Sequence, residues 1–83
     1  MPPLERRLRY LLHDLCIDWG FCLPSADTNR IAQSQQISAR MFAIEVMKAE
    51  GFGGSEGSEW ANKIEMRFIE YFGSDEASTS DYQ

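Results

Sequence analysis

The sequence predicts an all-α fold class, a compact bundle of three helices that gains a fourth if residues 27–35 form a helical turn of their own. Apolar residues recur at intervals of three, four and seven along three segments, as on the buried face of a helix. No segment alternates apolar and polar residues over the length of a strand. The chain of 83 residues has room for one core. We expect a helical domain over residues 1–73 and a disordered acidic tail over residues 74–83.

The first helix is predicted over residues 3–19. Pro2 and Pro3 suit a helix start, whereas Gly20 and Pro24 are typical of a helix end and of the turn after it. The buried stripe comprises Leu4, Leu8, Leu11, Leu12, Leu15, Cys16 and Trp19. Because these spacings place the side chains on one face, they form a single apolar stripe, as on a helix that packs against a core.

The second helix is predicted over residues 37–50, with Gly51 as its end. Its start is predicted either near residue 28 or near residue 35, because the intervening segment is polar and only weakly periodic. Apolar side chains lie on several sides of a helical wheel, with Ile37 and Met41 on one side and Phe42 nearly opposite. Such a helix should be central, or a partner should cover part of it.

The third helix is predicted from Ser58 to Phe72, with Gly73 as its end. The preceding segment, GFGGSEGS, has glycines before a helix N-terminus, as phosphate-binding loops do. It lacks a preceding strand and the lysine of a Walker loop, and Glu56 and Glu59 would repel phosphate. We therefore expect a flexible linker there.

The net charge is −5, and residues 51–83 hold the whole acidic excess. This balance argues against nonspecific attachment to nucleic acid or to an anionic membrane as the main task. The N-terminal segment is interrupted by charges and does not resemble a signal peptide, and no apolar run is long enough to span a membrane. We expect a cytoplasmic protein whose two cysteines are thiols rather than a disulfide.

The stretch HDLCIDWGFC, residues 13–22, gathers residues that can bind metal. His13, Cys16 and Cys22 would give three zinc ligands, with Asp14 or Asp18 as a weak fourth. A redox-active or disulfide pair is a second hypothesis, and activation of Cys16 by His13 as a nucleophile is a third. We favour a structural thiol, because Cys16 adjoins the apolar stripe and free cysteine is commonly buried. No metal ligand, cofactor or catalytic residue is therefore assigned.

Arg6, Arg7 and Arg9 form the densest basic patch. They fall in the first turns of the first helix, where positive charge opposes the helix dipole. The favoured interpretation is that they are solvated or meet acids of the third helix, through Glu65 or Glu70. The alternative is an acidic partner or a phosphate backbone.

The segment from residue 30 to residue 40 resembles a helix-turn-helix in outline, with Ser38 and Arg40 near the start of the second helix. The break lacks the glycine frequent in such turns, and the helix is too apolar for a DNA groove. For these two reasons, a small DNA-binding regulator is the alternative function and not the favoured one.

The favoured function is a small noncatalytic protein-interaction or regulatory module that presents an apolar helical surface. The hypothesis rests on the broad apolar circumference of the second helix, and methionine-rich surfaces adapt well to partner helices. Its expected partner is another protein or a second copy of the chain, with no membrane and no small-molecule substrate. The predicted binding residues are Ile37, Met41, Phe42, Ile44, Met47 and Phe52.

Overall fold

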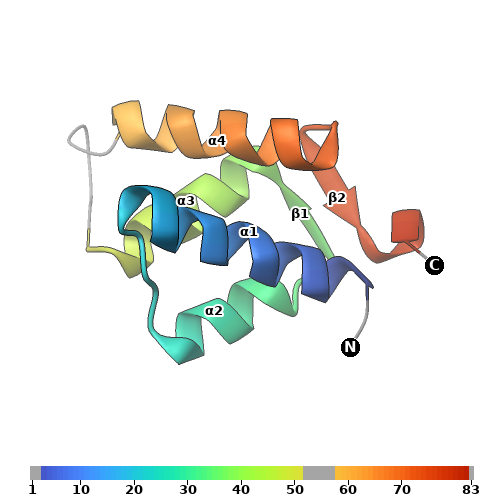
Figure 1. Cartoon of the computed structure of the whole chain (residues 1–83). Coiled ribbons are helices and arrows are strands. Elements are labelled where there is room, and N and C mark those ends of the chain that lie inside the picture. Colours follow the sequence, from blue (N-terminus) through green and yellow to red (C-terminus); the bar gives the residue numbers. More distant parts are fainter. Residues whose placement is uncertain (1–2, 52–57, 83) are drawn as a thin grey trace.

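The computed structural model describes residues 3–51 and 58–82, and that part of the chain is mostly helical (Figure 1). This confirms the predicted predominance of helix. The elements are helices α1 (Pro3–Trp19), α2 (Ser25–Ala32), α3 (Ala39–Ala49) and α4 (Ser58–Phe72), strands β1 (Gln36–Ser38) and β2 (Glu76–Ser78), and the 3₁₀ helix η2 (Thr79–Tyr82). The linker expected in the glycine-rich segment lies largely outside the described residues.

Helix α1 covers the predicted residues and buries the five leucines of the predicted stripe, whereas Cys16 and Trp19 are half-buried. Leu4, Leu8, Leu11 and Leu15 are fully buried. The helix ends because Gly20 adopts a left-handed conformation, with φ of 78°. Its amide donates a hydrogen bond to the carbonyl of Cys16 at 3.0 Å. The chain then turns back toward the end of α1, since the Phe21 amide donates to the carbonyl of Leu15.

The region predicted as a second helix, with a separate helical turn over residues 27–35 as the alternative, contains two helices with a strand between them. Helix α2 begins at Ser25, before either predicted start, and α3 begins at Ala39 rather than at residue 37. Ser38 explains the second boundary, because its extended backbone lets its Oγ accept a hydrogen bond from the Met41 amide at 3.1 Å. The side chain that suggested a contact with DNA is thus the N-cap of α3.

Strands β1 and β2 form a two-stranded antiparallel sheet, in which Ile37 lies opposite Ala77. The sheet is extended at its ends by two backbone hydrogen bonds, from Ala39 to the carbonyl of Asp75 and from Thr79 to the carbonyl of Gln35. Ala77 is only 1% exposed. The expected disorder of residues 74–83 is therefore corrected for residues 76–82, because a small apolar residue and backbone pairing hold this segment on the domain.

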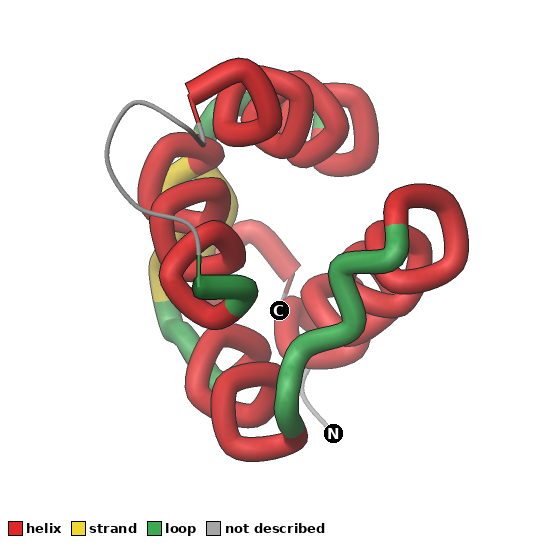
Figure 2. Tube along the Cα trace, turned by 90° about the vertical axis from the view of Figure 1, so that its left-hand side faces the viewer, coloured by secondary structure: helices red, strands yellow, loops and turns green. Residues whose placement is uncertain are grey.

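The core lies between two helix pairs, with α3 beside α4 and α1 beside α2 (Figure 2). The rings of Phe42 and Phe68, both fully buried, are 5.4 Å apart between α3 and α4. Helix α3 also buries Val46, so most of its apolar side chains face the core. The burial of these side chains agrees with the central position expected for this helix, although Met41 is 48% exposed.

Candidate functional site

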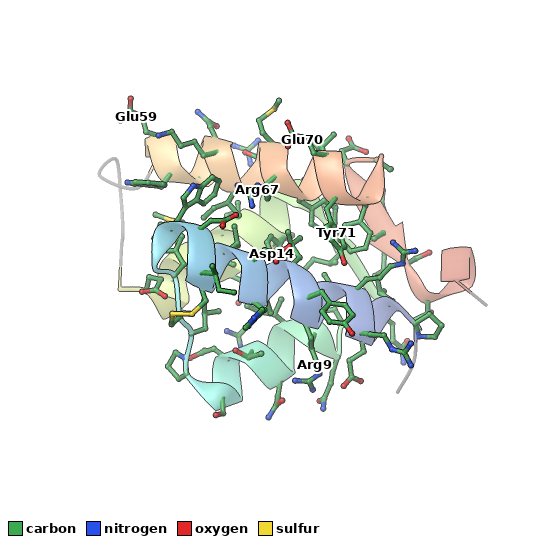
Figure 3. All side chains as sticks on the ribbon, viewed as in Figure 1. Arg9, Asp14, Glu59, Arg67, Glu70 and Tyr71 are labelled. Atoms are coloured by element: carbon green, nitrogen blue, oxygen red, sulfur yellow. A yellow bond between two sulfur atoms is a disulfide. The ribbon has the colours of Figure 1, made fainter. Side chains whose placement is uncertain are left out.

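Cys16 and Cys22 form a disulfide, with their Cα atoms 4.4 Å apart (Figure 3). This corrects the expectation of two thiols and of a buried Cys16. The physical reason is the turn at Gly20, which brings the residues after α1 back to its last turn. Cys16 is half-buried and Cys22 is exposed, so the bond lies at the surface.

The other residues of the proposed zinc set are dispersed. His13 is exposed, and Asp18 pairs with Arg67 of α4, with 2.8 Å between Oδ2 and Nη1. Among the described residues, no group of three or more His, Cys, Asp or Glu side chains is arranged to hold a metal ion. A cysteine binds zinc as a thiolate, and both sulfur atoms are in the disulfide, so neither cysteine is a zinc ligand in this form of the chain.

An aromatic cluster joins the end of α1 to the start of α4. The Phe21 ring meets the Trp60 ring edge-on at 5.2 Å, and Trp19 lies 5.6 Å from Trp60 and 6.3 Å from Phe21. The Arg67 guanidinium stacks 4.6 Å above the Trp19 ring while it pairs with Asp18. We call Trp19, Phe21 and Trp60 the aromatic cluster. The sequence predicted Trp19 as a buried stripe residue of the first helix but did not predict its contact with Trp60.

The arginine patch is divided by the fold. Arg9 donates two hydrogen bonds to Oε2 of Glu5, one turn earlier in the same helix, at 2.8 and 3.0 Å. Figure 3 shows Arg9 and Glu70 on opposite sides of the molecule, so the expected contact of the patch with α4 is not made by Arg9. Arg6 and Arg7 are exposed. They line a surface cavity of about 420 Å³ together with Pro3, Tyr10 and Tyr71.

The six residues predicted to bind a partner do not form one exposed surface. Ile37, Phe42 and Met47 are buried, and Ile44 is half-buried. Met41 is the exposed one among those that the structure describes, because Phe52 lies outside the described residues. The broad apolar circumference of this region is explained by its contacts with α4, α2 and β1.

An exposed face of α1 was missed by the sequence reasoning. Tyr10 is 57% exposed and Ile17 is 65% exposed, on the side opposite the buried stripe. Arg6 and His13 are also exposed and lie at helical spacing beside them. We call Arg6, Tyr10, His13 and Ile17 the α1 outer face. The sequence does indicate this face: Tyr10 and Ile17 are large apolar residues seven positions apart, and both lie outside the buried stripe of the first helix.

The region that suggested DNA binding uses its charges within the molecule. Arg30 of α2 hydrogen-bonds Asp27 at 3.0 Å and also pairs with Glu45 of α3. Hydrogen bonds to Asp27 and then to Glu45 raise the pKa of Arg30. This arginine therefore ties α2 to α3 and is not oriented for a phosphate backbone. Arg40 and Lys48 remain exposed on α3.

Comparisons with protein-family models, with curated proteins and with solved structures found no match to the chain. Within residues 3–51 and 58–82, no helix combines the length and the apolar character needed to cross a membrane.

Proposed function

We propose that the chain is a small noncatalytic interaction module that binds an acidic amphipathic helix of another protein along the α1 outer face. The observation that supports this most directly is the exposure of Tyr10 and Ile17 on the same side of one helix. This replaces the surface around α3 that the sequence suggested, since that surface is mostly buried.

The spacing of the two apolar residues suits a helical partner. Seven residues on a helix span about 10 Å, or two turns, so Tyr10 and Ile17 project in nearly the same direction. A partner helix with apolar residues seven apart could contact both side chains. Fully burying a large apolar side chain contributes roughly 1.5–3 kcal/mol, so two such contacts can supply a modest affinity.

The charges of the face favour an acidic partner. Among the residues that the structure describes, neither Arg6 nor His13 forms an ion pair, whereas Arg9 and Arg67 both do. The cavity between Arg6 and Tyr10 offers a place for an acidic side chain beside an aromatic ring. Arginine and tyrosine are also enriched among the residues that contribute most to protein interfaces.

The test is an affinity capture with the tagged full chain and three variants. Tyr10→Glu and Ile17→Glu change the α1 outer face, and Met41→Glu places the same charge on an exposed apolar residue of α3. The proposal predicts a partner held by the native chain and by Met41→Glu and lost from the other two variants. The partner must bind through an acidic amphipathic helix, and equal capture by all four proteins would reject the proposal.

Two rival functions give distinct results in the same preparation. Self-association would appear as a concentration-dependent dimer in sedimentation, abolished by Ile17→Glu. The DNA-binding alternative requires duplex binding that weakens steeply with salt. Two of its candidate contacts are used within the fold, because Ser38 caps α3 and Arg30 pairs with Glu45.

The cytoplasmic location expected from the sequence stays a prediction. The disulfide weighs against it, because lasting disulfides are characteristic of oxidising compartments, whereas disulfides in the cytosol are usually transient. Trapping the thiols in intact cells and measuring the alkylated mass distinguishes the two locations. A mostly reduced chain agrees with the cytoplasm, and a fully oxidised chain contradicts it.

A further inference from the structure

The disulfide lies beside a surface cavity and not within the core. A cavity of about 250 Å³ is lined by Arg9, Leu12, His13, Cys16, Cys22, Leu23 and Thr28. Cys22 is exposed, and Cys16, which lies in the last turn of α1, is half-buried. A thiol from solution can therefore approach the Cys22 sulfur through the cavity without any opening of the core.

The same bond encloses two residues of the aromatic cluster. It closes a ring of residues from Cys16 to Cys22 that contains Trp19 and Phe21. The aromatic side chains of Phe21 and Trp19 meet the Trp60 side chain of α4 edge-to-face, with ring centroids 5.2 and 5.6 Å away, respectively. The ring also contains Gly20, whose left-handed backbone makes the turn. Reduction of the disulfide releases the chain that follows this turn from the last turn of α1. The side chains of Trp19 and Phe21 then lose one constraint on their position.

We propose that the Cys16–Cys22 disulfide is a site of thiol–disulfide exchange, attacked at Cys22 by a low-molecular-weight monothiol, and that its opening releases the aromatic cluster. This goes beyond the proposed interaction function and does not depend on it. Two independent observations support it: Cys22 is an exposed residue beside the cavity, and two residues enclosed by the disulfide, Trp19 and Phe21, contact Trp60.

The exchange proceeds in two balanced steps. The thiolate of the monothiol attacks Sγ of Cys22, a mixed disulfide forms, and the bond to Cys16 breaks. Cys16 leaves as a thiolate and takes a proton from water. A second thiolate attacks the sulfur of the bound monothiol, which releases Cys22 as a thiolate that is protonated in turn. Two monothiols are thereby oxidised to one disulfide, and the protein disulfide is reduced to two thiols.

Two kinds of experiment on the full chain test the two parts of the proposal, which are the attack at Cys22 and the release of the aromatic cluster. In the first, reduced glutathione is the probe, the reaction is quenched with acid at intervals, and free thiols are alkylated. Peptide mass spectrometry then locates the mixed disulfide. We expect it at Cys22, with about tenfold less at Cys16 because attack requires access to the sulfur. A mixed disulfide mainly at Cys16, or no reduction without denaturant, would overturn the proposal.

In the matched variants Cys16→Ser and Cys22→Ser, the single remaining thiol is exposed to oxidised glutathione. Both variants lack the disulfide and carry one thiol, so they differ chiefly in the position of that thiol. We expect Cys22 in the first variant to form the adduct about tenfold faster than Cys16 in the second, because access governs the rate. Equal rates, or a faster reaction at Cys16, would contradict attack at Cys22.

The second experiment follows the indole N–H resonances of Trp19 and Trp60 by NMR, with Trp60→Phe for assignment. Trp60 is the critical reporter because it belongs to α4, outside the disulfide ring. On full reduction we expect its resonance to shift while the helical circular dichroism is retained. An unchanged Trp60 resonance would show that the bond does not hold the cluster. Loss of the helical signal would show that it is a structural crosslink of the whole fold.

Discussion

Ile37 and Ala77 lie directly opposite each other across the antiparallel pair of β1 and β2, and both are buried, at 6% and 1% exposure. They are 40 positions apart in the chain. Their pairing attaches the segment after α4 to the segment before α3 and so closes the core at that end. The C-terminal residues are thus part of the folded domain, which leads to the first prediction.

Replacing Ala77 with Asp should destabilise the fold by roughly 2–3 kcal/mol, because a carboxylate would enter a buried position that provides no partner for it. Glu76→Gln is the matched control, since Glu76 is exposed and its neighbour Gln36 keeps a hydrogen-bonding partner. Thermal unfolding measures the stability of both variants. A variant at Ala77 as stable as the control would mean that β2 is not held on the domain.

The pair formed by Asp18 and Arg67 should contribute little by its charge alone. Both side chains are partly exposed, at 48% and 27%, so Asp18→Asn should cost less than about 1 kcal/mol. Arg67→Ala should cost more, because it also removes the stacking on Trp19. A double-mutant cycle in chemical denaturation separates the two contributions. Equal losses from the two substitutions would show that the stacking adds nothing.

Gly20 should be required for its backbone conformation and not for space. Nothing lies within 4 Å of a Cβ built at this position, yet its φ is 78°. Gly20→Ala should therefore cost roughly 1–2 kcal/mol through left-handed strain. Gly20→Asn should cost less, because asparagine tolerates this region better. The ranking of the two melting temperatures checks the argument, and the reverse order would contradict it.

Removing the disulfide with the double substitution Cys16→Ser and Cys22→Ser should lower stability by about 2 kcal/mol, as expected for a short closed loop. For a domain of this size the melting temperature should fall by roughly 8–16 °C, with helical content retained at room temperature. Calorimetry measures the shift. A chain that no longer folds would indicate that the disulfide is a condition of folding.

Local patterns were sufficient to predict α1 and most of α4. The stripe from Leu4 to Leu15 repeats with a helical period, and Gly20 and Gly73 mark helix ends that the structure confirms. The short strands could not be predicted in this way. Gln36–Ser38 and Glu76–Ser78 each span three residues, and each forms only because the other lies beside it.

The candidate site was harder to predict for the same reason. A broad apolar circumference indicates burial but does not say what covers it, so Phe42 and Met47 were assigned to a surface that α4 and the rest of the core occupy. The disulfide was missed because a compartment argument outweighed the six-residue spacing of Cys16 and Cys22. Tyr10 and Ile17 lie outside the predicted buried stripe of the first helix, and no role was assigned to them from the sequence.

The most direct test of the proposed function is site-specific photocrosslinking from the α1 outer face. A benzophenone amino acid is placed at Ile17 in one protein and at Met41 in another, and the crosslinked peptides are sequenced by mass spectrometry. The account predicts that Ile17 yields one acidic amphipathic segment, that Met41 does not, and that Arg6→Glu abolishes the product. Crosslinks from Met41 alone, or products from Ile17 with no shared segment, would contradict it.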